Sequence, residues 1–379
     1  MKKETENSMK VLILSCNTGG GHNSAAHAIA EAMAWHGGEA YVMDYLTLAG
    51  EEVSRLVGDG YVHIVKKTPL LFGMTYKLGM VVSKITRKSL VYYVNGRMAK
   101  YLNKYLKDNP VDVLIMPHIY PSETIAYMKH KGIKLPLTVA VMTDYTCIPF
   151  WEETDADYYI IPHESLTDVF VKRGLPKEKL IPLGIPVSRI CRREISKEDA
   201  REKLGLSTEK KYILAAGGSM GAGNMSRLVE CLLKSTEDEE LIVICGSNKK
   251  VEKHLKKTFG SEKRLTILGY TNQMSLYMKA CDILFTKPGG LTSTEAAVSG
   301  IPIIHTEPIP GCETANRKFF GKYGMSVSGT TVKGQVQAGL RILYDEKEAS
   351  KMKENQQKNI NKMAADDICY FIREHLNDK

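Results

Sequence analysis

The fold is decided by a stretch of sequence that occurs twice in the 379-residue chain. Residues 10–33 read KVLILSCNTGGGHNSAAHAIAEAM, and residues 211–233 read KYILAAGGSMGAGNMSRLVECLL. Each has a short apolar run, a glycine-rich turn and a helix pattern of small residues, the order typical of a parallel strand and its crossover helix. Because the pattern restarts near residue 211, we predict two α/β domains, each a Rossmann-like, doubly wound parallel sheet.

Further short apolar runs, each followed by a helix pattern, extend both halves of the chain. They are residues 111–116, 137–143 and 158–161, then 241–245, 265–268, 283–286 and 301–305. Strands that alternate with helices form parallel sheets covered on both faces. We expect one domain over residues 9–185, a second over 186–358, and a final helix over 359–379 that can pack back on the first domain, with a cleft between the two.

Basic residues are concentrated in one segment of the chain. Lys plus Arg number 52 against 43 for Asp plus Glu, a formal net charge of +9. Residues 60–107 hold ten of the basic side chains, seven aromatic rings and no acidic residue. Such a segment attracts an anionic surface, either nucleic acid or anionic lipid, and composition alone does not choose between them.

Residues 66–77 are the best candidate for a membrane contact within this segment. Lys66 and Lys67 precede an apolar patch that contains Leu71, Phe72 and Tyr76. Rings and Leu side chains of this kind enter the interface of a bilayer while ammonium groups meet lipid phosphates, each Lys contributing roughly 1 kcal/mol. A disordered or core-packed insertion is the alternative.

A helix pattern over residues 90–107 predicts a helix that covers the sheet. Its apolar side comprises Val91, Val94, Met98, Leu102 and Tyr105, and its basic side Arg97, Lys100, Lys104 and Lys107. We expect the apolar side to pack inward and the basic side to be solvated.

The sequence lacks the usual features of an exported or membrane-spanning protein, which indicates the cellular compartment. Its eight cysteines have no C-x-x-C spacing, which is typical of a reduced protein. The first residues have no signal-peptide core, and no apolar stretch reaches the ~20 residues that span a bilayer. We therefore expect a cytoplasmic protein, bound peripherally to the inner face of the cell membrane.

Two loops of the second half are candidates for a nucleotide site. Gly217, Gly218, Ser219, Met220 and Gly221 follow a strand and open a helix, where backbone N–H groups and the helix dipole favour a diphosphate. Because the Lys-Ser/Thr of a P-loop is missing, the loop is more typical of a leaving diphosphate than of ATP hydrolysis. A tight turn that needs glycine only for its backbone geometry is the alternative.

The second loop, residues 287–296, also follows a strand. Thr292 and Glu295 have the spacing of a capping box, in which the side chains bind the N–H groups of their own helix. The alternative is that the Glu295 carboxylate accepts both hydroxyls of a ribose. A polar loop at residues 308–316 follows the next strand and is placed to contact a sugar.

His22 is the candidate base of the first half. It ends a run of three glycines directly after a strand, where an imidazole can take a proton near neutral pH. Asp144 also closes a strand and is the candidate that orients or assists this base. A packing role for His22 and a turn cap at Asp144 are the alternatives.

Metal-dependent chemistry is not predicted, and we expect no cofactor. The sequence has neither an H-E-x-x-H motif nor paired cysteine ligands. Asp155 and Asp157 form the D-x-D pattern with which some sugar transferases hold a metal-bound diphosphate, but here the two carboxylates precede a strand. We interpret them as part of a turn.

These motifs, in this order, resemble those of the bacterial diacylglycerol glycosyltransferases and plant monogalactosyldiacylglycerol synthases, relatives of MurG in glycosyltransferase family 28. The resemblance extends over residues 9–376 and rests on SCNTGGGHNSAA at 15–26, TDYTCIPFW at 143–151, LGIPV at 183–187, GGSMGAGN at 217–224 and KPGGLTSTEA at 287–296. It implies a GT-B fold and metal-independent, inverting transfer of a hexose from a UDP-sugar to diacylglycerol.

The resemblance also implies roles for single residues. The UDP-sugar site would comprise Gly217, Gly218, Ser219, Met220, Gly221, Tyr270, Thr271, Gly289, Gly290, Leu291, Thr292, Glu295, Glu313 and Asn316. Within it, the backbone near Tyr270 would contact uracil, Glu295 the ribose, and Glu313 with Asn316 the sugar. His22 falls where the family's proposed base lies. The acceptor and membrane side would comprise Gly20, Gly21, Lys66, Lys67, Leu71, Phe72, Tyr76, Phe150 and Trp151.

Two departures limit what the resemblance implies. Cys312 stands where relatives commonly have Gln, and Ile148 stands where many have His, so the identity of the hexose and the details of the acceptor side stay open. Two other kinds of function also stay open. The first is an enzyme of the same fold that transfers the sugar to a polyprenyl-linked acceptor, or that epimerises the UDP-sugar. The second is a non-catalytic UDP-sugar sensor. We expect no nucleic-acid partner.

Overall fold

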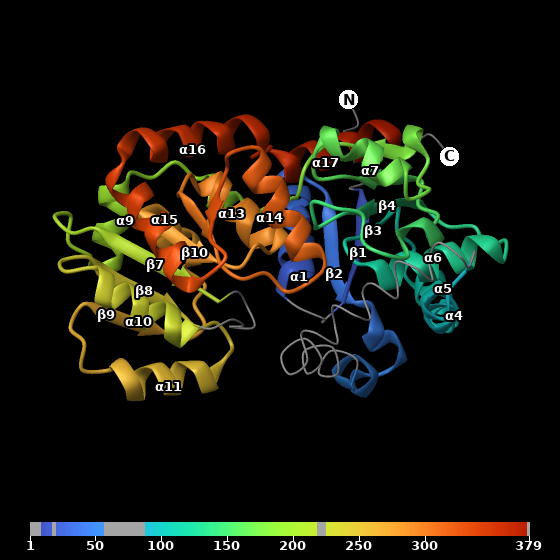
Figure 1. The fold of residues 1–379 in the computed structure, drawn as a ribbon. Coiled ribbons are helices and arrows are strands. Elements are labelled where there is room, and N and C mark those ends of the chain that lie inside the picture. The colour runs from blue at the N-terminus through green and yellow to red at the C-terminus, as the bar shows by residue number, and fades with distance from the viewer. Residues whose placement is uncertain (1–8, 17–19, 57–87, 218–224, 377–379) are drawn as a thin grey trace, which may run out of the picture. The chain divides into compact units, whose positions relative to one another are not determined.

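The computed structural model describes residues 9–16, 20–56, 88–217 and 225–376. Its contacts divide the chain into two units: among the described residues, 9–16, 20–56, 88–189 and 363–376 form the first and 190–217 and 225–362 the second. Within these residues each unit contains a parallel sheet of six strands flanked by helices (Figure 1). The predicted fold class of two doubly wound α/β domains is confirmed.

The sheet of the first unit has the strand order β2-β1-β3-β4-β5-β6. Its strands are β1 Lys10–Ser15, β2 Glu39–Asp44, β3 Val113–Met116, β4 Leu137–Val141, β5 Tyr158–Ile160 and β6 Leu180–Ile181. β1 pairs in parallel with both β2 and β3, with Val11 opposite Val113. The side chains of β3 and β4 are buried along their whole length, because helices cover both faces of the sheet.

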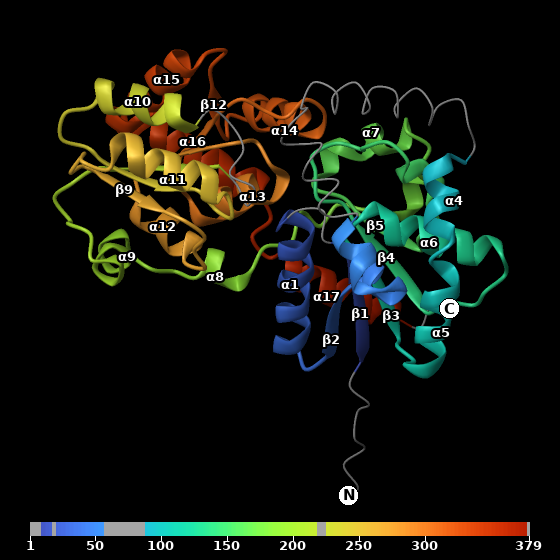
Figure 2. The same ribbon diagram turned by 90° about the horizontal axis from the view of Figure 1, so that it is seen from below.

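Helices of the first unit connect and cover these strands. They are α1 Gly20–Trp35, η1 Tyr45–Ala49, α4 Leu90–Gly96, α5 Ala99–Asp108, α6 Ile119–His130, η2 Trp151–Glu153, η3 Glu164–Leu166, α7 Thr167–Val171, η4 Lys177–Lys179 and the C-terminal α17 Ala364–His375. α17 packs beside α1 (Figure 2). Ile368 and Ile372 of α17 lie in one core with Ile29 and Met33 of α1, so the last helix completes the first unit.

The sheet of the second unit has the strand order β12-β11-β10-β7-β8-β9. Its strands are β7 Tyr212–Ala216, β8 Glu240–Ile244, β9 Leu265–Leu268, β10 Ile283–Thr286, β11 Ile303–His305 and β12 Val327–Ser328. Its helices are α9 Lys197–Leu204, α10 Met225–Ser235, α11 Lys249–Phe259, α12 Met274–Ala280, α13 Gly290–Ser299, α14 Cys312–Lys322, α15 Val332–Tyr344 and α16 Glu346–Asn359, and α8 Arg189–Arg192 lies where the two units join in sequence. Phe285 of β10 and Val336 of α15 belong to its separate core.

The helix predicted over residues 90–107 is two helices, α4 and α5. α4 turns its Tyr92, Asn95 and Gly96 inward and leaves Val94 53% exposed, so the predicted inward side is wrong for this part. The cause is the packing of α4 on α6. A Cβ atom at Gly96 would lie 2.6 Å from the ring of Tyr127, so only glycine allows this close approach.

Candidate active site

The strand order of the first sheet reverses between β1 and β3. From β1 the chain passes to β2 on one side, and the next strand, β3, pairs with β1 on the other side. In an open parallel sheet, ligands bind at the carboxyl ends of the strands at such a point. His22 lies in the first turn of α1 after β1, and Pro117 and His118 follow β3 directly. The structure therefore brings these three residues to the carboxyl-end edge of the first sheet, at this point of reversal.

The imidazole of His22 is held by two groups that the sequence did not single out. Its Nδ1 lies 2.8 Å from the carbonyl oxygen of Pro117 and 3.1 Å from Oγ1 of Thr143. A carbonyl oxygen can only accept a hydrogen bond. Nδ1 of His22 therefore carries the ring proton and donates a hydrogen bond to the carbonyl of Pro117. The other ring nitrogen, Nε2, is then unprotonated in the neutral ring. It is the nitrogen that can act as a base.

Burial keeps His22 neutral. Desolvation lowers its pKa below the usual value, while the negative charge of Asp144 and the hydrogen bond to Pro117 act in the opposite direction. Asp144 thus acts on His22 through its charge. The role of His22 as the base and that of Asp144 as its assistant stay predictions. The geometry favours a neutral His22 ring, which is the protonation state that a base needs.

A second imidazole, His118, lies against the first. The ring centroids of His22 and His118 are 4.5 Å apart and the rings are nearly perpendicular, at 79°. Nδ1 of His118 accepts the backbone N–H of Tyr120 over 3.2 Å and so caps α6. The sequence reasoning missed His118, although its position directly after an apolar run was a signal that could have found it.

The strand order of the second sheet reverses between β7 and β10. A pocket lies at the carboxyl ends of these strands. It is lined by Ala216, Gly217, Met225, Leu228, Phe285, Lys287, Thr306, Glu307, Val332 and Gln335. Gly217 is the one described member of the first predicted loop, because Gly218, Ser219, Met220 and Gly221 lie outside the described residues. The pocket occupies the place where an α/β sheet binds a nucleotide.

The structure excludes one of the two interpretations of residues 292 and 295, the capping box. α13 begins at Gly290 and its N-cap is Gly289, so Thr292 lies inside the helix and the capping box is wrong. Burial raises the pKa of Glu295 to about 7. Within the part of the chain that the structure describes, no hydrogen bond or ion pair of its carboxylate is found, and a contact with ribose stays a prediction.

Glu313 and Asn316 hold the loops beside the pocket together. One carboxylate oxygen of Glu313 lies 2.9 Å from Nζ of Lys287, and the other accepts the N–H of Ile309 over 2.7 Å. Asn316 is fully buried and donates to the carbonyl of Pro288 over 3.0 Å. The two side chains thus join the loop after β10 to the loop after β11. Their contact with a sugar stays a prediction.

The remaining predicted contacts of the nucleotide lie on loops at the same sheet edge. Tyr270 follows β9 and is 76% exposed. The hydroxyl of Thr271 accepts the N–H of Gln273 over 3.0 Å and shapes the turn into α12. Leu291 is buried in the first turn of α13. A uracil contact through the backbone near Tyr270 is compatible with this exposure and stays a prediction.

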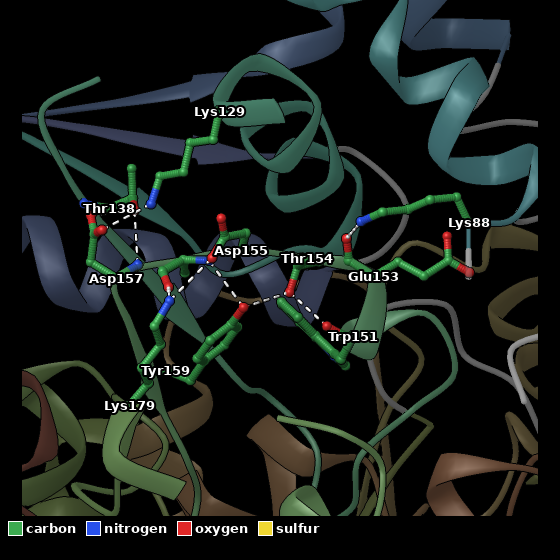
Figure 3. A network of polar contacts seen from close by, with 11 residues as sticks. Lys88, Lys129, Thr138, Trp151, Glu153, Thr154, Asp155, Asp157, Tyr159 and Lys179 are labelled. Atoms are coloured by element: carbon green, nitrogen blue, oxygen red, sulfur yellow. Dashed lines mark hydrogen bonds and ion pairs between the residues drawn. The ribbon is translucent and has the colours of Figure 1, made fainter. Parts of the chain in front are cut away.

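The D-x-D pattern has a structural role (Figure 3). Asp155 pairs with Lys179 at 3.1 Å. Asp157 pairs with Lys129 at 2.9 Å and accepts hydrogen bonds from both the N–H and the hydroxyl of Thr138. These contacts fix the loop before β5, as the turn interpretation predicts. In the described part of the chain no group of three or more His, Cys, Asp or Glu side chains is arranged to hold a metal ion.

The contacts predicted for the acceptor side stay predictions. Trp151 is 4% exposed, so its indole is packed within the first unit. The cause is η2, which turns Trp151 into the unit after Phe150, whose φ of 75° is the one positive value among the described non-glycine residues. Gly20 and Gly21 begin α1 next to His22. Lys66, Lys67, Leu71, Phe72 and Tyr76 lie outside the described residues.

α4 carries an exposed apolar and basic face that the sequence reasoning placed elsewhere. Leu90, Tyr93 and Val94 are 78%, 57% and 53% exposed. Arg97, the C-cap of α4, follows them at helical spacing and is exposed. We call these four residues the α4 face. Lys100, at the start of α5, is also exposed.

Comparison with known proteins finds a matching family model for each of two parts of the chain. Residues 22–187 match the monogalactosyldiacylglycerol (MGDG) synthases, and residues 196–359 match the glycosyl transferases group 1. The chain is a glycosyltransferase, similar to the MGDG synthases in its first part and to the group 1 glycosyl transferases in its second. This glycosyltransferase is 28% identical over 351 residues to the processive diacylglycerol beta-glucosyltransferase of Bacillus pumilus, which covers 91% of this chain and 90% of that protein. The corresponding enzyme of Bacillus licheniformis is 27% identical over 357 residues, covering 91% and 89%.

Solved structures confirm the GT-B fold. MurG of Acinetobacter baumannii is 18% identical with a TM-score of 0.62, covering 97% of this chain and 99% of that chain. UDP-GlcNAc 2-epimerase of Neisseria meningitidis bound to UDP-GlcNAc is 15% identical with a TM-score of 0.63, covering 97% and 100%. At these identities the likeness concerns the fold alone. None of the described helices of this glycosyltransferase is long and apolar enough to cross a membrane.

Proposed function

We propose that this glycosyltransferase transfers a hexose from a UDP-sugar to the hydroxyl of 1,2-diacylglycerol, with inversion at the anomeric carbon and without a metal ion. The observation that carries the proposal is the 2.8 Å contact between Nδ1 of His22 and the carbonyl oxygen of Pro117, which favours the tautomer with the proton on Nδ1 and leaves Nε2 to accept another. Relatives that match about nine-tenths of this chain are named diacylglycerol beta-glucosyltransferases, which favours diacylglycerol as acceptor and glucose as the hexose.

His22 starts the reaction by accepting the proton of the acceptor hydroxyl at Nε2. The O–H bond breaks, the oxygen attacks the anomeric carbon from the face opposite the diphosphate, and the bond from that carbon to the phosphate oxygen breaks. The electron pair leaves with UDP. The carbonyl of Pro117 keeps the ring in the right tautomer, and the charge of Asp144 stabilises the imidazolium that forms.

The second unit binds the donor at the pocket between β7 and β10. The loop of residues 217–221 holds the diphosphate in this proposal, and the N-terminus of α13 directs further backbone N–H groups at it, where negative charge develops as UDP departs. The Glu295 carboxylate accepts both ribose hydroxyls, which fits the finding that no hydrogen bond or ion pair occupies it within the described chain. Lys287 at the pocket wall adds a positive charge, which the Glu313 carboxylate holds in place.

Peripheral binding to the inner face of the cell membrane brings the enzyme to its acceptor. The α4 face supports this part, because exposed Leu, Val and Tyr side chains next to Arg suit the interface of an anionic bilayer. The segment with Lys66, Lys67, Leu71, Phe72 and Tyr76 has the same composition. Both belong to the basic part of the chain, so they can act together.

The acceptor is tested with liposomes that contain diacylglycerol. The protein is incubated with them and with UDP-glucose, UDP-galactose or UDP-N-acetylglucosamine, and the lipids are identified by mass spectrometry. We expect a hexosyl-diacylglycerol with UDP-glucose. Glycosylation of a polyprenyl phosphate acceptor in a parallel reaction, with no diacylglycerol product from any donor, would show that the acceptor assignment is wrong.

Membrane binding is tested by flotation with vesicles that contain or lack anionic lipid. We expect the protein to float with the anionic vesicles, and a variant with Leu90, Tyr93 and Val94 all changed to Ser to float less. An oligonucleotide of random sequence serves as the competing anion. Strong salt-dependent binding to it, without flotation, would overturn the membrane assignment.

A further inference from the structure

His305 is the last residue of β11, and its side chain is fully buried. Its Nε2 lies 2.9 Å from Oγ of Ser293, in the first turn of α13. Its Nδ1 lies 3.0 Å from Oγ of Ser326, which directly precedes β12. Its ring also contacts Phe320 of α14 edge to face, with the ring centroids 5.3 Å apart. One buried imidazole thus joins the end of β11 to α13, to α14 and to the start of β12.

Both ring nitrogens of His305 are hydrogen-bonded. Burial and the positive charge of Arg317 lower the pKa of His305 to about 3, so the ring is neutral at neutral pH. A neutral imidazole has one N–H and one lone pair, and a serine hydroxyl can pair with either of them. The ring therefore donates to one serine and accepts from the other. Because an unpaired buried polar group is costly, removal of either hydroxyl disrupts a defined link.

The start of α13 is not held by a cap of its own. Its N-cap, Gly289, has no side chain that can accept from the first N–H groups of the helix, and a Cβ atom added there would have nothing within 4 Å. An uncapped N-terminus suits the part that α13 has in the proposed function, since its N–H groups are not taken by a capping side chain. Such a helix start needs contacts further along the helix to keep it in place.

Ser293 supplies a contact of this kind. A serine or threonine inside a helix commonly bonds a carbonyl one turn back, as the hydroxyl of Thr294 does with Gly290 over 2.7 Å. The hydroxyl of Ser293 lies instead against the ring of His305. This bond ties the first turn of α13 to the end of β11, whose next two residues line the donor pocket. It also holds the part of the helix that carries Glu295.

We propose that His305 is a positioning residue for the UDP-sugar, which acts through Ser293 on the first turn of α13. The inference rests on the proposed function, which assigns contacts of the diphosphate to the N-terminus of α13 and the ribose to Glu295. The buried ring holds these groups where the donor requires them, so less ordering is needed when UDP binds. The bond to Ser326 serves a different element, the edge strand β12, which carries no predicted donor contact.

Two single substitutions separate this role from support of the fold alone. Ser293→Ala and Ser326→Ala each remove one hydroxyl from the same ring, so both should lower the melting temperature by similar amounts. Ser326→Ala keeps the link to α13. We therefore expect the Kd for UDP, measured by calorimetry, to rise about fivefold or more in Ser293→Ala and to stay within about twofold of wild type in Ser326→Ala. Any result in which Ser293→Ala does not weaken UDP binding more than Ser326→Ala does would overturn the inference.

A double variant tests whether the effect of Ser293 runs through the imidazole. His305→Leu removes both ring nitrogens, so the hydroxyl of Ser293 loses its partner. In that background Ser293→Ala should change the Kd for UDP by less than about twofold. A further loss as large as in the wild-type background would mean that Ser293 acts without His305, and the inference would be wrong. Should His305→Leu fail to fold, the two serine variants decide.

The kinetic readout is transfer from UDP-glucose to diacylglycerol. In Ser293→Ala we expect the KM for UDP-glucose to rise about fivefold or more, while the KM for the lipid stays within about twofold of wild type. The inference and the proposed function fail in different ways. If UDP binding responds to the serine variants as expected but no lipid is glycosylated, the proposed acceptor is wrong and the role of His305 stands. If the wild-type protein does not bind UDP, both are wrong.

Discussion

At the residue scale, two opposed influences set the basicity of His22. Burial favours the neutral ring, and the charge of Asp144 favours the imidazolium. The balance lies on the side of burial, so His22 loses its proton below its usual pKa of about 6.5. A base must be neutral to act, so kcat/KM should fall as the pH drops through this lowered pKa.

Asp144→Asn removes the influence that raises the pKa of His22. We expect the acid limb of the kcat/KM profile to move to lower pH, and the plateau rate to drop about tenfold, because the base is weaker and its imidazolium is less stabilised. The pH profiles of both proteins between pH 5 and 9 test this. Asp168→Asn, an exposed change on α7, is the matched control and should leave the profile unchanged. A limb that moves to higher pH in Asp144→Asn would contradict this account of the base.

Glu295 provides a second pH-dependent test at this scale. Its pKa of about 7 means that the carboxylate is mostly protonated at pH 6 and mostly ionised at pH 8. Only the ionised form accepts both ribose hydroxyls, so the affinity for uridine should rise over this range by roughly fivefold to tenfold. Uridine is used because it has no phosphate that titrates here.

In Glu295→Gln we expect weaker uridine binding that does not change between pH 6 and pH 8. Competition against a fluorescent UDP analogue measures both affinities. Glu237→Gln, at an exposed loop of the same unit, should behave like the wild-type protein. An unchanged pH dependence in Glu295→Gln would remove Glu295 from the ribose site.

At the scale of single elements, the close packing of α15 on β10 limits the side-chain volume that the core of the second unit can accommodate. Gly339 of α15 faces Phe285 of β10 so closely that an added Cβ atom would overlap the ring. Overpacking of this kind costs about 1–3 kcal/mol. Gly339→Ala should lower the free energy of unfolding by that amount, measured by urea denaturation.

Gly321→Ala is the matched control for this substitution. Gly321 also lies in a helix of the second unit, α14, but nothing is within 4 Å of its added Cβ atom. Alanine is the better helix former, so the stability should stay constant or rise by up to about 1 kcal/mol. Equal losses in the two variants would mean that helix propensity and not packing decides at Gly339.

The sequence predicts those elements whose signal is local. β9 and β10 have the bounds that their apolar runs predict, because each is a short run of mostly apolar residues between turn residues. β2 was not predicted, since its residues are half-buried or exposed and its ends are acidic, and β6 and β12 are only two residues long. The break between α4 and α5 depends on Gly96 meeting Tyr127, a contact between distant residues that no periodicity reveals.

The candidate site shows the same limit. His22 was found because it ends a glycine run directly after a strand, which is a local pattern. Thr143 and His118 were missed because they meet His22 only through the order in which β1, β3 and β4 pair. Glu295 was found as one of two alternatives, and the start of α13 at Gly290 excludes the other.

At the scale of the whole molecule, each unit has its own hydrophobic core. We therefore expect two transitions in calorimetric unfolding. Gly339→Ala should lower the transition of the second unit. Ile368→Ala, which empties part of the first core beneath α17, should lower the other by about 2–5 kcal/mol.

These variants allow the nucleotide to be assigned to one unit. UDP at a hundred times its dissociation constant should stabilise the transition that Gly339→Ala lowers by about 2.7 kcal/mol, and should leave the other in place. If UDP stabilises only the transition that Ile368→Ala lowers, the nucleotide binds to the first unit, which would contradict this account.

The most direct test of the catalytic proposal is the rate of glycolipid formation by His22→Ala, measured beside its affinity for UDP by calorimetry. General base catalysis contributes about 10²–10⁴-fold, so the rate should fall by at least 10²-fold while the affinity stays within about twofold of wild type. A variant that transfers the hexose at the wild-type rate would contradict the account, because the first unit would then supply no base.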